Sequence, residues 1–229
     1  MRVVFVPGFT QFAPSWRPVT RFFDHDPDFE PEAVDVPDGL DFAATAARLG
    51  EEHGRAVYVG YSMGGRLSLQ LALDHPELVE RLVLVSASPG IADPAAREDR
   101  RRSDEDLAQR LARIGVDAFL DEWLAQPLFA SLPADVADLD GRRANTVERL
   151  AHQLTDLGQG TQPSNWDRLG EITMPTLLFA GAKDAKYVTI AEQMADPMRA
   201  NLRVLSGCGH ACHLEGGSFW SLLKSWLRG

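Results

Sequence analysis

Short apolar segments alternate with helical stretches along most of this chain, and this alternation constrains its fold more than any other feature. Each apolar segment is rich in valine, leucine or alanine and short enough to be a buried strand. They occupy residues 3–6, 33–36, 56–59, 82–85, 175–180 and 202–205. Strands separated by helices form a mostly parallel sheet with helices on both faces. The sequence therefore predicts an α/β fold.

Residues 91–169 interrupt this alternation. They are charged, rich in alanine and helical in pattern, and they contain no strand-like run. Their position between two expected strands predicts a helical cap inserted over the strand ends. A length of 229 residues fits one domain, 1–229, that carries this insertion. Outside the cap we expect helices at 42–53, with Asp41 as the N-cap, at 62–74 and at 218–227.

The formal charge of −10 argues against nucleic acid or an anionic membrane surface as the main partner. A small anionic substrate remains compatible with this charge, because a pocket can be locally basic. No segment approaches the ~18 apolar residues of a membrane span, and the N-terminus lacks the features of a signal peptide. Two cysteines do not make a disulfide framework. We therefore expect a cytoplasmic protein, and its oligomeric state stays open.

The segment Gly60-Tyr61-Ser62-Met63-Gly64 fits the pattern Gly-x-Ser-x-Gly, and it lies between an expected strand and an expected helix. A sharp turn from strand to helix exposes the serine hydroxyl, and glycines on either side avoid collisions in that turn. The start of the helix adds free N–H groups and a positive dipole. This context favours Ser62 as a nucleophile or base over an inert turn residue.

A serine needs a histidine and an orienting carboxylate to act in either role. Asp184 and His210 each follow an expected strand, where parallel sheets place their ligands. The order Ser62, Asp184, His210 is that of the catalytic triad in α/β-hydrolases. Taken alone, Asp184 could instead be a turn or helix-cap residue, and His213 competes with His210. The backbone N–H groups of Phe9 and Met63 are the candidates for an oxyanion hole.

Cys208 and Cys212 stand close to two histidines, a grouping that could suggest zinc. A structural zinc site would need a second pair of ligands elsewhere, and the chain has no other cysteine. We therefore predict no metal site and interpret both cysteines as small packing residues.

Arginine suits carboxylates because its donors form a fixed fork. Arg66 lies four residues after Ser62 and therefore on the same helix face. Further arginines open the insertion, and most of them could equally form a solvated helix face paired with neighbouring acids. These are Arg97, Arg100, Arg101 and Arg102. The aromatic residues that could either line a pocket or pack the cap are Trp123, Phe129 and Trp166.

Two cap segments are more distinctive, Gln-Pro-Leu-Phe-Ala-Ser at 126–131 and Gly-Gln-Gly-Thr-Gln-Pro-Ser at 158–164. Together with segments 60–66, 88–90, 100–104 and 181–187, they carry a resemblance that spans the chain. The whole chain resembles α/β-hydrolases. The cap more narrowly resembles the 2-succinyl-6-hydroxy-2,4-cyclohexadiene-1-carboxylate synthase family of menaquinone biosynthesis.

Members of that family are lyases that eliminate pyruvate from a carboxylate-rich cyclohexene precursor. The resemblance implies that Ser62 removes a proton, that His210 accepts the proton of Ser62 and that Asp184 fixes the imidazole. The N–H groups of Phe9 and Met63 would stabilise negative charge beside a carbonyl. The residues that would hold the substrate are Tyr61, Arg66, Arg100 and Trp123. No cofactor is implied.

Two alternatives follow from the same residues. A small carboxylesterase would use the same triad to form an acyl-serine intermediate. A receptor with this fold would bind a small molecule and carry out no chemistry, although the intact order of serine, aspartate and histidine argues against it.

Overall fold

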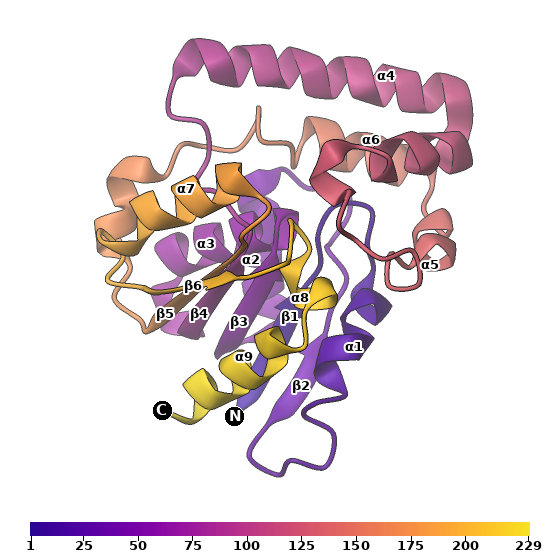
Figure 1. The fold of residues 1–229 in the computed structure, drawn as a ribbon. Coiled ribbons are helices and arrows are strands. Elements are labelled where there is room, and N and C mark those ends of the chain that lie inside the picture. The colour runs from indigo at the N-terminus through magenta and orange to yellow at the C-terminus, as the bar shows by residue number, and fades with distance from the viewer.

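The computed structural model describes residues 1–229, and a six-stranded parallel sheet forms its centre (Figure 1). The strand order is β2-β1-β3-β4-β5-β6. The strands are β1 (Arg2–Val6), β2 (Glu30–Ala33), β3 (Ala56–Tyr61), β4 (Val79–Val85), β5 (Thr176–Gly181) and β6 (Asn201–Leu205). Every neighbouring pair is parallel, which confirms the predicted α/β fold with a parallel central sheet.

Two apolar cores lie on opposite faces of the sheet because successive strand residues point to opposite sides. Val4 and Tyr58 belong to one core, whereas their neighbours Phe5 and Val59 belong to the other. The first core is covered by α2 (Phe42–His53), α3 (Met63–Asp74) and α7 (Ala185–Ala195). The second is covered by η1 (Ala13–Trp16), α1 (Arg17–Thr20), α8 (Cys212–Glu215) and α9 (Ser218–Arg228).

The connection between β4 and β5 is helical, and its longest part lies above the sheet in Figure 1. Its elements are α4 (Pro94–Leu124), η3 (Pro127–Phe129), α5 (Leu139–Arg143), α6 (Val147–Thr155) and η4 (Trp166–Glu171). Leu111 and Phe119 of α4 pack with Leu150 of α6 in a small third core. Gly115 interrupts α4 with φ 78° and ψ 172°, a conformation that favours glycine. The chain therefore changes direction at this residue, between two helical halves of α4.

The helices predicted outside the cap form close to the expected bounds. Asp41 caps α2, because its Oδ1 atom accepts a hydrogen bond of 2.8 Å from Ala44 N. The sequence patterns did not predict α7, which begins directly after Asp184, nor the short elements η1, α1, η2 (Pro76–Leu78) and α8. None of the helices combines the length and the apolar character that crossing a membrane requires.

The strand predicted at 33–36 is wrong in its position, since β2 ends at Ala33. This edge strand pairs only with β1, and the last pair in register is Phe5 with Ala33. Pro7 follows directly after β1 and has no N–H group with which to extend the ladder. Val34 and Val36 are buried in the adjoining loop. Their apolar character therefore reflects packing rather than strand pairing.

Candidate active site

Ser62 lies in a strained turn between β3 and α3, with φ 49° and ψ −108°. A positive φ is uncommon for a residue with a side chain. The turn is packed so closely that a Cβ atom on Gly64 would lie 2.3 Å from Val6 O. A Cβ atom on Gly60 would lie 2.4 Å from Gly64 O. Both glycines are therefore required by close backbone contacts, and the turn directs Ser62 into a cavity under the cap.

Ser62, His210 and Asp184 form a continuous hydrogen-bonded array. His210 Nε2 lies 3.0 Å from Ser62 Oγ, and His210 Nδ1 lies 2.6 Å from Asp184 Oδ2. Asp184 is also the N-cap of α7, where its Oδ1 atom accepts a hydrogen bond of 3.4 Å from Tyr187 N. Asp184 therefore both caps the N-terminus of α7 and accepts a hydrogen bond from His210. The structure brings together the three residues that the sequence order suggested.

His213, the alternative to His210, does not contact Ser62. It is fully buried, and its ring lies between Trp16 and Tyr61, with centroid distances of 4.5 and 4.2 Å. Neither ring nitrogen of His213 has a hydrogen-bond partner. Burial holds the pKa of His213 well below its usual value, so this histidine is neutral at physiological pH.

Glu215 fixes the loop that carries His210. Its Oε2 atom accepts a hydrogen bond of 2.7 Å from Gly209 N, and its Oε1 atom accepts one of 3.2 Å from Ala211 N. These two amides flank His210 on either side. One carboxylate therefore holds both ends of the peptide segment that bears the imidazole.

Phe9 and Met63 lie at the two places expected for oxyanion-hole donors. Met63 is the first residue of α3, where backbone N–H groups have no partner within the helix. Phe9 lies in the turn after β1, and its ring lines the cavity. Gln11 braces this turn, because its Oε1 atom accepts a hydrogen bond of 3.1 Å from Gly8 N.

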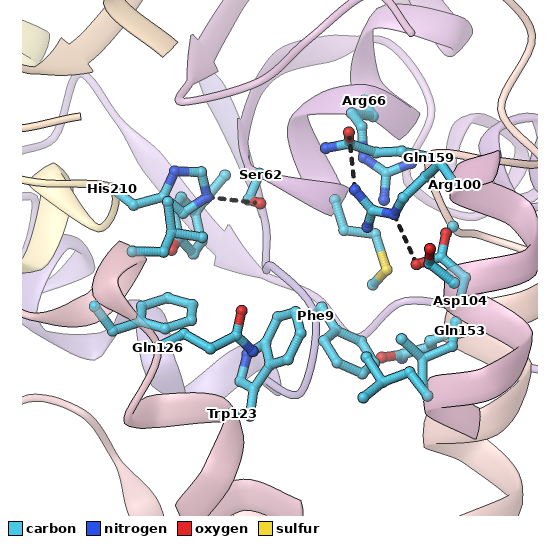
Figure 2. A pocket seen from close by; sticks show the side chains of 18 of the residues that line it. Phe9, Ser62, Arg66, Arg100, Asp104, Trp123, Gln126, Gln153, Gln159 and His210 are labelled. Carbon is cyan, nitrogen blue, oxygen red and sulfur yellow. Dashed lines mark hydrogen bonds and ion pairs between the residues drawn. The ribbon is translucent and has the colours of Figure 1, made fainter. Parts of the chain in front are cut away.

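The cavity beside Ser62 has a volume of about 540 Å³ and a cationic lining. Figure 2 shows Ser62 and His210 at one end and the group of Arg66, Gln159 and Arg100 at the other. The cationic residues of the lining are Arg66, Arg100, Arg142 and Lys186. Asp104 is the only carboxylate among the lining residues. A strongly acidic protein therefore presents a cavity that attracts anions.

Arg66 is buried and forms no ion pair. It donates hydrogen bonds to two neutral acceptors, Gln162 Oε1 at 3.1 Å and Leu157 O at 2.8 Å. Burial lowers the pKa of Arg66 to about 10, so the guanidinium still carries its charge at neutral pH. No carboxylate forms an ion pair with Arg66, and the charges of Asp104 and Arg100 act on it with opposite signs, so its charge is available to an anionic ligand.

Arg100 is the arginine of its cluster that lines the cavity. Its Nε atom donates to Asp104 Oδ1 at 2.8 Å, and its Nη1 atom donates to Gln159 Oε1 at 3.2 Å. Arg101 and Arg102 instead form exposed ion pairs with acids of the same helix. Arg100 therefore faces the cavity, whereas Arg101 and Arg102 lie on the solvated face of α4.

Sequence reasoning missed several polar residues of the cavity, Arg142 above all. Arg142 is 2% exposed and donates to Ala137 O at 2.7 Å and to the hydroxyl of Thr10. It forms no ion pair, and burial lowers its pKa. Nothing in its exposed-looking segment, Asp-Gly-Arg-Arg, indicates that the cap buries it against the turn of Phe9. Lys186, Tyr187 and Gln159 also line the cavity without having been assigned a role.

The aromatic candidates divide into two groups. Trp123 and Phe129 line the cavity, and the ring of Trp123 packs edge-on against Phe9 at 4.9 Å. Tyr61 also lines it, and its ring lies 5.5 Å from that of His210. Trp166 does not reach the cavity, because its indole packs against the core of the sheet and donates to Gly90 O at 2.9 Å.

Both cysteines belong to the apolar core beneath the site. Burial raises the pKa of Cys208 and of Cys212, which disfavours the thiolate form that binds metals. Their surroundings agree with a packing role.

Comparison with known proteins gives one family model and a consistent set of relatives. The model of the alpha/beta hydrolase family matches residues 3–218. A protein of Serratia proteamaculans (strain 568), named 2-succinyl-6-hydroxy-2,4-cyclohexadiene-1-carboxylate synthase, is 32% identical over 193 residues, which cover 82% of this chain and 74% of that protein. A Bacillus subtilis (strain 168) relative that carries this name provisionally is 37% identical over 163 residues. That match covers 69% of this chain but only 60% of the relative's length.

A solved structure agrees with these relatives. The structure of MenH from S. aureus superposes with a TM-score of 0.91 at 28% identity, and the match covers all of this chain and 93% of the other. The similarity therefore includes the cap as well as the sheet.

Proposed function

The chain belongs to the alpha/beta hydrolase family and is similar to proteins named 2-succinyl-6-hydroxy-2,4-cyclohexadiene-1-carboxylate synthase. From this premise we propose that it is a lyase of menaquinone biosynthesis that eliminates pyruvate from a carboxylate-rich cyclohexene precursor. The substrate is a small anionic molecule, and the reaction requires no metal or redox cofactor.

The observation that carries this proposal is the charge of the cavity next to the serine. Four cations and one carboxylate line it, and two of the cations, Arg66 and Arg142, are buried without an anionic partner. Burying an uncompensated charge costs free energy, so such residues suit a ligand that brings the opposite charge. A neutral ester would leave them unpaired, whereas a substrate with several carboxylates would not.

The proposed chemistry begins with proton transfer along the array of Ser62, His210 and Asp184. Asp184 accepts the Nδ1–H of His210, so the free Nε2 atom can accept the proton of Ser62. The oxygen of Ser62 then removes a proton from the substrate carbon beside a carbonyl. The electron pair of that C–H bond forms the new double bond as the bond to the leaving group breaks. The leaving group departs as the enolate of pyruvate and takes up the proton that His210 received from Ser62, which gives pyruvate and restores the array. No acyl-enzyme is formed.

Negative charge develops on the carbonyl oxygen during this step. The backbone N–H groups of Phe9 and Met63 are the proposed donors to that oxygen, and the N-terminus of α3 adds its positive dipole. Arg66, Arg100 and Arg142 hold the carboxylates of the substrate, while Tyr61 and Trp123 contact its ring. Fixed donors in a cavity that excludes water stabilise developing charge better than solvent does.

A pyruvate-release assay tests this function. The wild type should form pyruvate and the cyclohexadiene product from the precursor, and Ser62→Ala should lower the rate by about a thousandfold or more, as removal of a triad member does elsewhere. Ser221→Ala, an exposed serine of α9, is the matched control and should keep full activity. Failure of the wild type to release pyruvate would refute the proposed reaction.

A carboxylesterase is the second candidate, because Ser62 has the geometry of a nucleophile as well as that of a base. An esterase would release p-nitrophenol from p-nitrophenyl acetate with an initial burst and would be titrated by a phosphonate. The synthase should turn over this neutral ester slowly. A receptor without catalysis is the third reading, and it would be favoured if Ser62→Ala left the biological activity unchanged.

A further inference from the structure

Tyr187 lies between the proposed triad and the cationic end of the cavity. It is 5% exposed, lines the cavity, and its ring lies 4.5 Å from the ring of His210 in an edge-on arrangement. Its backbone N–H donates to Asp184 Oδ1 at 3.4 Å. The N-terminal turn of α7 thus holds the backbone of Tyr187, and His210 packs against its ring.

The hydroxyl of Tyr187 takes part in a chain of hydrogen bonds that ends at the cap. Gln159 Nε2 donates to the Tyr187 hydroxyl at 2.8 Å, and Gln159 Oε1 accepts from Arg100 Nη1 at 3.2 Å. Arg100 in turn donates to Asp104 at 2.8 Å. Because a guanidinium can only donate, Arg100 fixes the Gln159 amide with Oε1 toward itself, and the amide then presents Nε2–H to the phenolic oxygen.

This arrangement leaves the phenolic proton without an acceptor in the protein. A phenol can donate one hydrogen bond while its oxygen accepts another, and here the oxygen is already engaged by Gln159. Burial raises the pKa of Tyr187, although the nearby charges of Arg66 and Arg100 act in the opposite direction. The hydroxyl thus stays protonated at neutral pH and remains a donor.

We propose that Tyr187 is a specificity-determining residue whose hydroxyl donates to a substrate carboxylate bound between Arg66 and Arg100. Arg66 brings an unbalanced charge to this point, and the charge of Arg100 is shared with Asp104. A phenol adds a third donor without adding a further charge to desolvate. The location rests on the proposed function, but the inference concerns carboxylate binding and does not depend on the elimination step.

Direct titration tests the inference without the natural substrate. Succinate supplies two carboxylates, and succinamide has the same shape without charge. In calorimetric titrations, the wild type should bind succinate at least about tenfold more tightly than succinamide. The reason is that a hydrogen bond to a charged group contributes about 1.5–3 kcal/mol. Tyr187→Phe should weaken succinate binding about tenfold and leave succinamide binding unchanged.

Tyr58→Phe is the matched control, because that buried hydroxyl donates to Gly54 O at 2.7 Å and lies outside the cavity. It should bind succinate as the wild type does. Equal succinate affinity in Tyr187→Phe and the wild type, or no preference of the wild type for succinate over succinamide, would overturn the inference. Thermal unfolding of each variant verifies that the fold is retained.

Gln159→Leu separates direct contact from positioning. If the hydroxyl contacts the carboxylate, Gln159→Leu retains part of the affinity and the double variant with Tyr187→Phe binds more weakly than either single variant. If the double variant is no weaker than Gln159→Leu alone, Tyr187 acts only through the amide and the direct contact is wrong.

The pyruvate assay supplies the kinetic counterpart. Tyr187→Phe should raise KM more than it lowers kcat, because the ring against His210 is kept. A wild type that binds succinate through Tyr187 but releases no pyruvate would refute the proposed reaction and leave this carboxylate site standing.

Discussion

Replacing Arg66 with methionine tests whether this arginine serves to bind a ligand or to stabilise the fold. Arg66 is buried in α3 with neutral partners only, so the folded protein bears the cost of an unbalanced charge. Methionine has a similar length and no charge. We expect Arg66→Met to weaken substrate binding strongly while changing the stability of the free protein little.

The expected change in stability follows from two opposing contributions. Burial lowers the pKa of Arg66 from 12.5 to about 10, which corresponds to about 3 kcal/mol of destabilisation at neutral pH. Both the folded and the unfolded chain hold this proton between about pH 5 and pH 8, so the contribution does not vary with pH in that range. Methionine removes this cost but leaves Gln162 Oε1 and Leu157 O without a donor, at about 1–3 kcal/mol each. The two effects nearly cancel.

Urea unfolding and the pyruvate assay measure the two outcomes. The free energy of unfolding of Arg66→Met should lie within about 2 kcal/mol of the wild-type value, and kcat/KM should fall by about a hundredfold. Arg81→Met is the control, because Arg81 also donates to a backbone carbonyl, Trp226 O at 3.0 Å, but lies outside the cavity. It should keep full activity. If Arg66→Met lowered the free energy of unfolding by 4 kcal/mol or more, this arginine would be required for stability, and its assignment to ligand binding would be wrong.

Three further substitutions test the site and its frame. Glu215→Gln should lower kcat about tenfold with little change in KM, since it loosens the backbone on both sides of the His210 imidazole. The control Glu192→Gln, at an exposed position, should have no effect, and equal kcat in the two variants would contradict the positioning role of Glu215. His213→Phe should make the stability of the protein less sensitive to acid. A histidine whose pKa is lowered in the folded state makes stability fall as the pH drops below the unfolded pKa of about 6.5. In urea titrations, the free energy of unfolding should therefore fall by about 2 kcal/mol less between pH 7 and pH 5 in the variant than in the wild type. Gly64→Ala should prevent stable folding, since its Cβ atom would lie 2.3 Å from a backbone carbonyl, and circular dichroism should distinguish it from Gly170→Ala, where the site is open.

The local patterns of the chain determined the frame of the fold. Runs of valine and leucine predicted five of the six strands near their observed places. Four of these are largely buried, and a buried parallel strand needs apolar residues on both faces, whereas β6 is a mostly exposed edge strand. The glycines around Ser62 marked a turn that tolerates no side chains. Such features act between residues that are close in sequence, so they can be read from the chain itself. The edge strand was misplaced because its end depends on where β1 stops pairing, which is a property of another segment.

The residues of the cavity show where sequence reasoning ends. The order of Ser62, Asp184 and His210 indicated an array, but only the packed loop decides that His210 meets the serine while His213 stacks between Trp16 and Tyr61. His210 and His213 are only three residues apart, and the sequence does not show which of the two side chains points toward Ser62.

The sequence by itself determined the parallel sheet, the serine turn and the helical nature of the insertion, since each depends on short-range sterics and on the alternation of apolar residues. The tertiary structure alone decided which cations face the serine. It turned Arg100 inward and left Arg101 in solvent, and it buried Arg142 against Thr10, 132 positions away in the chain. Contacts of this kind depend on how the cap packs over the strand ends, and no local pattern specifies that geometry.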